Sequence, residues 1–478
     1  MNYKMIRYII GWLIVFESVF MLFPALVALV CGENSFFSFL LSIGLGLLGG
    51  GLLVVKKPKR TTMYAREGFV TVSVSWLVLS VFGAIPFLLT GSIPSVIDAL
   101  FESVSGFTTT GATILSDVEC LEKSVLLWRS FTHWIGGMGV LVFIMAVIPL
   151  SGGSNIHLMR AESTGPSVSK LVPKMKQTAL LLYGMYITLT VIEMVLLILW
   201  KMPVFDAVNT AFSTAGTGGF GIKNDSITSY SPGIQNIVTI FMILFGVNFS
   251  VYYMIICKKF WDVFKSTELK AYLGILFAAI LAITFNIKDM YGEFFVALRH
   301  AAFQVASIMS STGFSTADYN VWHGFSKNVL VTVMMIGACA GSTGGGIKVF
   351  RITVLLKTLK KELETSVHSR SVKKIKIDGR ILNHEVVRAV NVFMVAYIVL
   401  FFCSMLIISM ENYDFTTNFT AIAAMINNTG PGLEAVGPTQ NFGKFNILTK
   451  CVCILDMLAG RLELFPVLIL FTPSTWKK

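Results

Sequence analysis

Apolar segments long enough to cross a lipid bilayer recur along the whole chain. A membrane-spanning helix needs about 20 mostly apolar residues, and ten segments approach or exceed that length. They cover residues 6–30, 36–55, 69–90, 125–150, 178–200, 234–257, 270–286, 327–356, 389–410 and 446–471. Because lipid offers the backbone no hydrogen-bond partners, each segment is expected to be helical. The pattern predicts an all-α polytopic membrane protein with both termini on one side of the bilayer.

The composition favours one membrane domain and excludes a soluble enzyme. Hydrophobic residues make up 55% of the 478 residues and charged residues only 13%, against roughly 25% charge in a soluble domain. The seven cysteines and six histidines show no metal-ligand or disulfide spacing. No nucleophile, base and metal ligands converge on one place, so we predict no catalytic residues and no cofactor bound by this chain.

The net charge of +12 raises the question of nucleic-acid binding. If the amino terminus is cytoplasmic, most of the 38 Lys and Arg residues fall in cytoplasmic connections, with the largest group at residues 348–388. Membrane proteins show this bias because basic loops are retained inside. The charge therefore reports topology rather than nucleic-acid binding, and both termini are predicted to be cytoplasmic.

Four shorter apolar stretches, of a length more typical of re-entrant segments than of spans, each end in a Thr-Gly pair. The pairs are Thr110-Gly111, Thr217-Gly218, Thr312-Gly313 and Thr429-Gly430. The first and third stretches also share Phe and Ser at the same distances before the pair, whereas the second and fourth vary there. The pairs recur about every 100 residues, which indicates an internal fourfold repeat.

Each repeat is expected to contain a span, a re-entrant half-helix, a Thr-Gly loop and a second span. The second spans each carry a glycine at a similar distance past the loop: Gly136, Gly246, Gly337 and Gly460. Residues 1–66 hold two additional N-terminal spans, and the repeats are predicted to cover residues 67–160, 161–265, 266–375 and 376–478. The predicted fold is four pseudo-repeats around a central pore.

A non-helical loop at membrane depth leaves backbone carbonyls unpaired, which is tolerated only inside protein or around a watery cavity. Four such loops around one axis would replace an ion's hydration shell with carbonyl oxygens, as potassium filters do. Glycine permits the backbone angles of such a turn, and threonine adds a hydroxyl group. One isolated Thr-Gly pair is more often a turn in an external loop, so the specificity of the signal lies in its repetition. The predicted potassium-binding filter consists of Thr109, Thr110, Gly111, Thr217, Gly218, Ser311, Thr312, Gly313, Asn428, Thr429 and Gly430.

The chain resembles the TrkH/KtrB superfamily of potassium transporters, and its TrkH branch in particular. The similarity covers essentially the whole chain and rests on residues 108–113, 127–139, 217–220, 341–348 and 460–461. The two additional amino-terminal spans favour the TrkH branch. The resemblance implies one polypeptide that mimics a tetrameric channel, and potassium uptake across a prokaryotic inner (plasma) membrane. Gly111 at the first filter position implies potassium rather than sodium.

The same resemblance implies protein partners. They are a second copy of the chain, in a membrane homodimer, and a cytosolic ring of RCK-type, TrkA-like nucleotide-binding subunits. The basic segment 348–388 has two interpretations: a solvated cytoplasmic loop in contact with anionic lipid, or a docking site for that regulatory subunit. The chain contains no Walker A or G-x-G-x-x-G context, so any nucleotide is expected to bind the partner.

A run of small residues interrupts the apolar segment 327–356. It consists of Gly341, Ser342, Thr343, Gly344, Gly345 and Gly346. Glycine is unfavourable inside a helix, so the run is predicted to be unwound. It is either a passive kink or, as the resemblance favours, a mobile loop that plugs the path just below the filter.

Two arginines lie within apolar segments. Arg461 is deep in the last span, where a charge costs at least about 2.5 kcal/mol. We predict that Arg461 faces the pore as an electrostatic barrier; the alternative is a structural ion pair, with Glu463 as a weak candidate partner. Arg129 lies nearer an outer end, and a structural role is equally open for it.

A tightly coupled K⁺/H⁺ or K⁺/Na⁺ symporter is the main alternative to a gated pore. Such transporters normally combine inverted repeats with broken helices around a midplane site. Here the repeats share one orientation and the filter is expected near the outer face, which favours the gated pore. The deviating loops, with Gly216 and Gly219 in the second and Asn427 in the fourth, predict a selectivity less strict than that of a symmetric channel.

Overall fold

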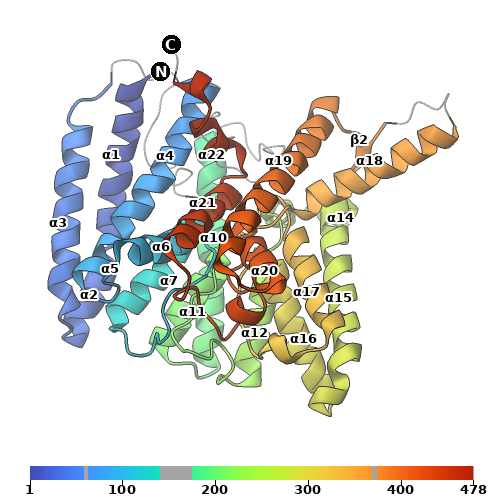
Figure 1. Ribbon diagram of the computed structural model, residues 1–478, viewed down its shortest axis with the longest axis horizontal. Helices are drawn as coiled ribbons and strands as arrows, with labels where there is room; N and C mark the ends of the chain where they lie inside the picture. The colour runs from blue at the N-terminus through green and yellow to red at the C-terminus, as the bar shows by residue number, and fades with distance from the viewer. Residues whose placement is uncertain (59–62, 140–174, 369–373, 477–478) are drawn as a thin grey trace.

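The computed structural model describes residues 1–58, 63–139, 175–368 and 374–476. Helices dominate the molecule (Figure 1). Among the described residues the strands are β1 (Lys376–Ile377) and β2 (Arg380–Ile381), which pair antiparallel. The predicted all-α class is therefore confirmed. The predicted boundary between the first and second repeats, at residue 160, and the last part of the apolar segment 125–150 lie outside the described residues.

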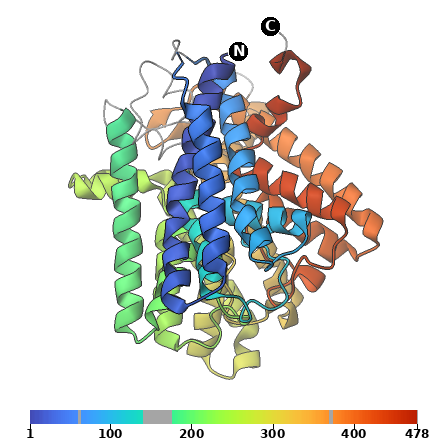
Figure 2. The same ribbon diagram turned by 90° about the vertical axis from the view of Figure 1, so that its left-hand side faces the viewer.

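A helical hairpin at the amino terminus packs beside the rest of the molecule (Figure 2). Its first arm is α1 (Tyr3–Phe20) continued by α2 (Leu22–Cys31), which together form a 29-residue apolar stretch. The second arm, α3 (Ser35–Val54), packs along α1. Small residues bring the backbones together: a Cβ added to Gly50 would lie 2.8 Å from the carbonyl oxygen of Gly11, a close approach typical of membrane helix pairs.

Four units of similar order follow this hairpin. The first contains α4 (Ala65–Gly83), α5 (Ile85–Leu89), α6 (Val96–Phe107) and α7 (Lys123–Gly137). The second contains α10 (Met175–Leu199), α11 (Val204–Gly216), α12 (Pro232–Phe245), α13 (Phe249–Ile256) and α14 (Phe260–Lys265). The third contains α15 (Thr267–Tyr291), α16 (Phe294–Met309), η1 (Tyr319–Val321), α17 (Gly324–Ile336) and α18 (Val349–Val367). The fourth contains α19 (His384–Ile408), η2 (Ser409–Glu411), α20 (Phe415–Ile426), η3 (Glu434–Val436), α21 (Ile447–Arg461), α22 (Phe465–Leu470) and η4 (Pro473–Thr475).

The short helices α6, α11, α16 and α20 are the re-entrant elements of the four units. They contain 12, 13, 16 and 12 residues, about 18–24 Å of helix, which is too short for a hydrocarbon core of about 30 Å. Side-chain caps start two of them: Ser95 accepts from Asp98 N, and Asp414 accepts from Thr417 N. The helices are buried toward their carboxyl ends, where the loops of interest begin.

In the second, third and fourth units, the spans that follow the re-entrant loops are broken rather than continuous. Six described helices are long and apolar enough to cross a membrane, or seven if the pair α12 and α13, bent by 90°, counts as one span. The sequence predicted the break in the third unit, from the run Gly341 to Gly346, but not the breaks in the second and fourth units. In the third unit, α17 ends before Gly337, which has φ 74°, and in the fourth, α21 ends one residue after Gly460. Hydropathy does not reveal the breaks in the second and fourth units because the residues on both sides of each break are mostly apolar.

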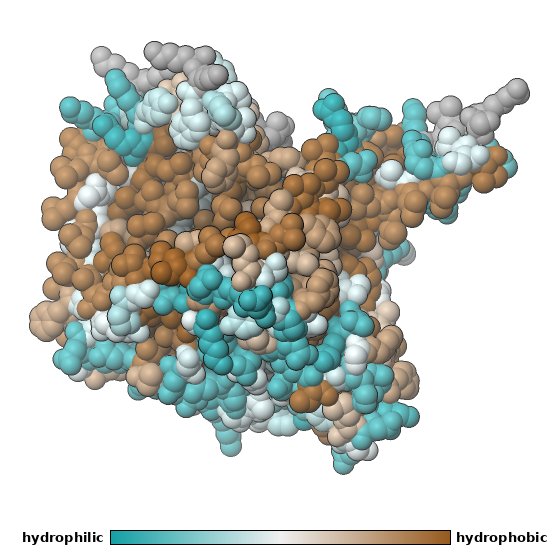
Figure 3. All heavy atoms as spheres, in the orientation of Figure 1, coloured by the Kyte–Doolittle hydropathy of each residue, from teal (hydrophilic) through white to brown (hydrophobic). Residues whose placement is uncertain are grey.

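The outer surface matches a membrane environment. Figure 3 shows a broad hydrophobic band with hydrophilic residues gathered at its margins. Large apolar side chains on the long helices are well exposed, among them Leu52 at 76% and Leu406 at 68%. Water would strongly disfavour such a surface, so the chain is a multi-pass membrane protein.

Candidate selectivity filter and intramembrane loop

Each re-entrant helix leads into the same local backbone conformation. A residue in the left-handed region, with φ between 52° and 60°, is followed two positions later by a glycine with positive φ. The left-handed residues are Thr109, Thr217, Ser311 and Asn428, and the glycines are Gly111, Gly219, Gly313 and Gly430. The intervening residue donates its N–H to the carbonyl five positions earlier, with N···O distances of 2.8–2.9 Å in all four loops. The loops therefore share one backbone template despite different side chains.

This template corrects the predicted alignment of the second loop. Alignment on the Thr-Gly pairs matches Gly218 to Gly111, but the backbone matches Gly219 to Gly111 and Gly218 to Thr110. The predicted register was wrong by one residue, because Thr217 occupies the left-handed position at the end of its helix rather than the position after it. Gly219, which the predicted filter omits, belongs to the set of loop glycines.

A serine upstream of the loop carries the signal that could have fixed this register. With the corrected alignment, Ser213 falls at the position of Ser307, six residues before the loop glycine. The two hydroxyls make the same bond: Ser213 Oγ donates to Phe220 O over 2.9 Å, and Ser307 Oγ donates to Phe314 O over 2.6 Å. Serine and the Gly-Phe pair, rather than Thr-Gly, are therefore the better markers for these two repeats.

The four loops close into a ring. A Cβ added to each glycine would meet a carbonyl oxygen of the next loop: Gly111 at 1.8 Å from Gly218 O, Gly219 at 1.9 Å from Thr312 O, Gly313 at 2.3 Å from Thr429 O, and Gly430 at 2.6 Å from Thr110 O. Each of these carbonyl oxygens belongs to the residue just before the ring glycine of its own loop. The glycine of the fourth loop contacts the first loop, which closes the ring. Because real Cβ atoms essentially never approach within 3.0 Å of such atoms, side chains are excluded at these positions, and the loops surround one axis at close range.

One cavity opens onto this ring. It has a volume of about 120 Å³, and all four ring glycines line it together with the loops that follow them. Thr113, Asn224, Ser315 and Gln440 contribute polar side chains to its wall. The ring is thus accessible through a polar mouth that the loops of all four units line.

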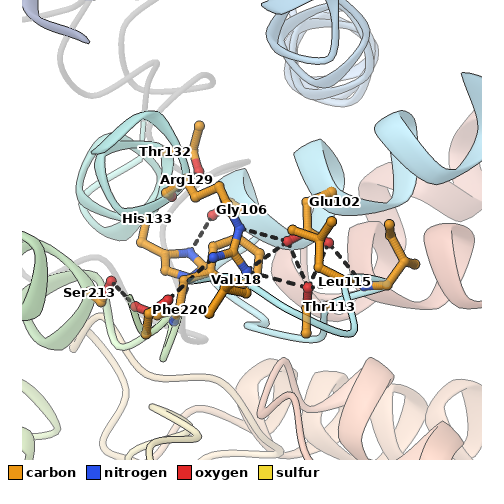
Figure 4. A network of polar contacts seen from close by, with 12 residues as sticks. Glu102, Gly106, Thr113, Leu115, Val118, Arg129, Thr132, His133, Ser213 and Phe220 are labelled. Atoms are coloured by element: carbon orange, nitrogen blue, oxygen red, sulfur yellow. Dashed lines mark hydrogen bonds and ion pairs between the residues drawn. The ribbon is translucent and has the colours of Figure 1, made fainter. Parts of the chain in front are cut away.

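Behind the first two loops lies a buried polar network (Figure 4). Arg129 on α7 forms an ion pair with Glu102 on α6 at 2.9 Å, with side chains only 2% and 0% exposed. Thr113 Oγ1 donates to Glu102 over 2.9 Å, and Arg129 Nη1 donates to Gly221 O over 3.3 Å. Arg129 is therefore a structural cation that links the first re-entrant helix to both loops, which resolves its open role.

Sequence reasoning missed Glu102 and His133 as ionisable members of this network. His133 is fully buried and bridges the carbonyl oxygen of Gly106 to the backbone N–H of Phe220. A signal was present: a lone ionisable residue within an apolar membrane segment normally has a partner inside the protein.

The run Gly341 to Gly346 is not helical. It forms the tip of a loop that begins where α17 ends, at Ile336, and finishes where α18 begins, at Val349. Two bonds close its base, because Ile347 N donates to Met335 O over 3.2 Å and Lys348 N donates to Ile336 O over 2.9 Å. The unwound conformation predicted from the glycines is therefore present.

The tip of this loop lies against the filter loops of the third and fourth units. Gly345 N donates to Ser311 Oγ over 2.5 Å, and Gly346 N donates to Asn427 O over 3.1 Å. A Cβ on Gly344 would lie 2.7 Å from Ser310 O. Glycine is thus required here for close approach to the filter, beyond any role in breaking the helix.

The loop also contacts the second unit. Thr343 Oγ1 donates to Phe245 O over 3.2 Å, and Phe249 N donates to Gly341 O over 3.0 Å. Ser342 braces the loop internally, since its Oγ donates to Cys339 O over 2.7 Å. The segment therefore crosses beneath the ring from one side to the other.

Arg461 joins this loop to the first unit. Its guanidinium donates to Thr343 O over 2.9 Å, to Gly137 O over 2.8 Å and to Gly136 O. The side chain is 8% exposed. Glu463, the weak candidate partner from the sequence, instead pairs with Arg351. The structure thus places Arg461 with the loop and the filter units, as a bridge between backbone carbonyls.

Four re-entrant helices with a closed ring of carbonyl-rich loops and a loop beneath them define a polytopic membrane protein of the four-repeat cation-pore architecture. The sequence model of the TrkH family, described as cation transport protein, matches residues 36–285 and 293–478. The chain belongs to the TrkH family. This confirms the family resemblance and the four-repeat fold predicted from the sequence.

Several characterised proteins are similar over their full length. The Trk system potassium uptake protein TrkH of Salmonella typhimurium is 35% identical over 486 residues, which covers 100% of both chains. The Trk system potassium uptake protein TrkG of Escherichia coli is 33% identical over 99% of both. The crystal structure of the potassium transporter TrkH from Vibrio parahaemolyticus superposes with a TM-score of 0.90, at 34% identity over 100% of both chains.

Proposed function

We propose that this protein is the pore-forming membrane subunit of a potassium uptake system. The observation that carries the proposal is the closed ring of Gly111, Gly219, Gly313 and Gly430, in which each glycine abuts a carbonyl of the next loop. Carbonyls packed this closely around one axis can replace the hydration shell of a monovalent cation. The relatives named potassium uptake proteins, at about one-third identity over the full length, support potassium as that cation.

The intramembrane loop serves as the gate of the proposed pore. Its tip bonds to Ser311 and Asn427 at the inner side of the filter, so it occupies the route that an ion leaving the ring would take. Arg461 fastens the loop through Thr343 O and supplies a positive charge there. Lys348 and Arg351, both buried, add to this charge, with Glu463 paired to Arg351. A cation must therefore wait until the loop and these groups move.

The proposed partners are a second copy of the chain and a cytosolic RCK-type, TrkA-like subunit that binds the nucleotide. Helix α18 projects from the body of the molecule (Figures 1 and 3). It carries an apolar stripe of Leu356, Leu359, Leu363 and Val367, which are 56–75% exposed. Their spacing places them on one helix face, and Lys357, Lys360 and Lys361 flank it. An apolar stripe among basic residues suits a protein partner better than water.

The proposed location of the protein is a prokaryotic inner membrane, with both termini in the cytoplasm. The basic connections predicted to be cytoplasmic support this orientation. In this arrangement the polar mouth of the filter faces outward and α18 faces the cytosol, which suits uptake under cytosolic control.

Complementation of cells that lack their own potassium uptake systems tests the proposal. Cells that express the chain should grow at low potassium and take up K⁺ and Rb⁺, whereas cells with Gly313→Asp should not. Gly274→Ala is the matched control, because no atom lies within 4 Å of a Cβ added to Gly274. Normal uptake by Gly313→Asp would refute the filter assignment, and uptake that collapses with the proton gradient alone would favour the symporter.

A further inference from the structure

The second filter loop differs from the other three at one ring position. Gly218 stands where the other loops have threonine: Thr110, Thr312 and Thr429. The space beside Gly218 is filled by a side chain from a different unit. A Cβ on Gly218 would lie 2.3 Å from Cγ of the His133 imidazole and 2.4 Å from its Nδ1. The second loop therefore has glycine at this position, and the imidazole of His133 occupies the space that a threonine side chain would need.

The imidazole of His133 makes two hydrogen bonds that tie two units together (Figure 4). Its Nδ1 lies 2.7 Å from Gly106 O on α6, and its Nε2 accepts from Phe220 N over 3.2 Å. A carbonyl can only accept and a backbone N–H can only donate. Both bonds are satisfied together only by the neutral imidazole with its proton on Nδ1. The ring thus acts as a directional bridge from the first re-entrant helix to the second loop.

The aromatic ring of Phe220, directly after the ring glycine Gly219, is held between two side chains of α7. Its centroid lies 4.2 Å from that of His133 and 4.2 Å from the Arg129 guanidinium carbon. Arg129 and His133 are four residues apart and share one face of α7. The residues that follow the second filter loop are therefore held in place by α7 of the first unit.

This contact is specific to one pair of units. The residue three positions before the second-span glycine is His133 in the first unit, but Ile243, Met334 and Met457 in the others. His133 of the first unit contacts Gly218 of the second loop. The other three loops have threonine at the position of Gly218. An apolar side chain could neither accept from Phe220 N nor donate to Gly106 O.

We propose that His133 is a specificity-determining positioning residue of the filter. Its neutral imidazole replaces the missing threonine of the second loop and, through Phe220 N, keeps the carbonyls of Gly218 and Gly219 at their ring positions. His133 does not touch the ion in this account. The proposal rests on the proposed function as a potassium pore.

Initial rates of K⁺ uptake, and their inhibition by Na⁺, test this role in potassium-uptake-deficient cells, normalised to the amount of chain in the membrane. His133→Leu keeps bulk but cannot bond, whereas His133→Gln offers one donor and one acceptor. Loss of a buried hydrogen-bond partner is expected to raise the KM for potassium about tenfold in His133→Leu. Sodium should inhibit this variant more strongly, and His133→Gln should lie closer to the wild type in both measures.

A second pair of variants tests the replacement directly. Gly218→Thr alone should abolish uptake, because its Cβ collides with the imidazole. His133→Ala with Gly218→Thr opens that space and should recover uptake relative to Gly218→Thr. Thr284→Ala is the control, since this buried threonine on α15 donates to Ile280 O within its own helix.

Two results would overturn the proposal. One is a His133→Leu variant with the wild-type KM and sodium inhibition; the other is a double variant no better than Gly218→Thr. Failure of the wild-type chain to take up potassium would instead refute the proposed function, so the two failures are distinguishable.

Discussion

Replacement of Gly219 by alanine is the most informative perturbation of the ring. The new Cβ would lie 1.9 Å from Thr312 O, whereas real Cβ atoms stay beyond about 3.0 Å. One of the two loops must therefore move by roughly 1 Å, in a tightly packed interior that transmits strain. Gly219 also has φ 80°, and a left-handed conformation costs a residue with a Cβ about 1–2 kcal/mol. Both effects fall on carbonyls of the proposed ion site.

We expect Gly219→Ala to reduce the initial rate of potassium uptake at least about tenfold, which corresponds to about 1.4 kcal/mol. The assay is K⁺ and Rb⁺ uptake into potassium-depleted cells, normalised to membrane-inserted protein. Gly184→Ala on α10 is the control, because nothing lies within 4 Å of its added Cβ. A Gly219→Ala variant with the wild-type rate and the wild-type preference for potassium over sodium would refute the ring and its corrected register.

Two further predictions concern the gate and the buried ion pair. Arg461→Ala, and separately deletion of Gly344, Gly345 and Gly346, should raise the basal flux of K⁺ into liposomes, because each change removes contacts that hold the loop under the filter. Arg380→Ala, at an exposed position, is the control. Unchanged flux in both gate variants would refute the proposed gate. Glu102→Gln leaves the buried Arg129 without its counter-ion and should destabilise the detergent-purified protein by about 3–5 kcal/mol, seen as a lower thermal transition. Glu362 is exposed and pairs with Lys361 at 3.3 Å. Glu362→Gln should change the free energy of unfolding by no more than about 1 kcal/mol, and equal effects of the two variants would contradict the assigned burial of Glu102.

The fourfold architecture could be predicted from the sequence because local sequence patterns determine it. Apolar length marks the spans, and glycine marks turns that side chains forbid, so the recurrence of four Thr-Gly pairs about every 100 residues revealed the repeat. The register of the second loop was not predictable from Thr217-Gly218, because the backbone angles, and not the residue letters, decide which residue is left-handed. The helix breaks in the second and fourth units were missed because hydropathy averages over them, whereas the glycine run 341–346 predicted the break in the third unit.

The pairing of buried charged and polar side chains could not be predicted from the sequence. Glu102 and Arg129 are 27 residues apart and lie on helices joined by a loop, so nothing local pairs them. Glu463 looked like a partner for Arg461 by proximity, yet α21 ends at Arg461 and Glu463 follows it in a left-handed conformation with φ 57°. Arg351 from the third unit pairs with the Glu463 carboxylate instead. The role of His133 was not predicted because the sequence analysis relied on positions that recur in several units, and this histidine occurs in only one of them.

Cation flux through the purified chain in liposomes is the decisive measurement for the proposed potassium filter. We expect K⁺ and Rb⁺ to pass in preference to Na⁺, driven by their own gradients, and Gly111→Ser to lower this preference at equal protein content. Equal flux of Na⁺ and K⁺ through the wild-type chain, or an unchanged preference in Gly111→Ser, would contradict a potassium filter built on the four ring glycines.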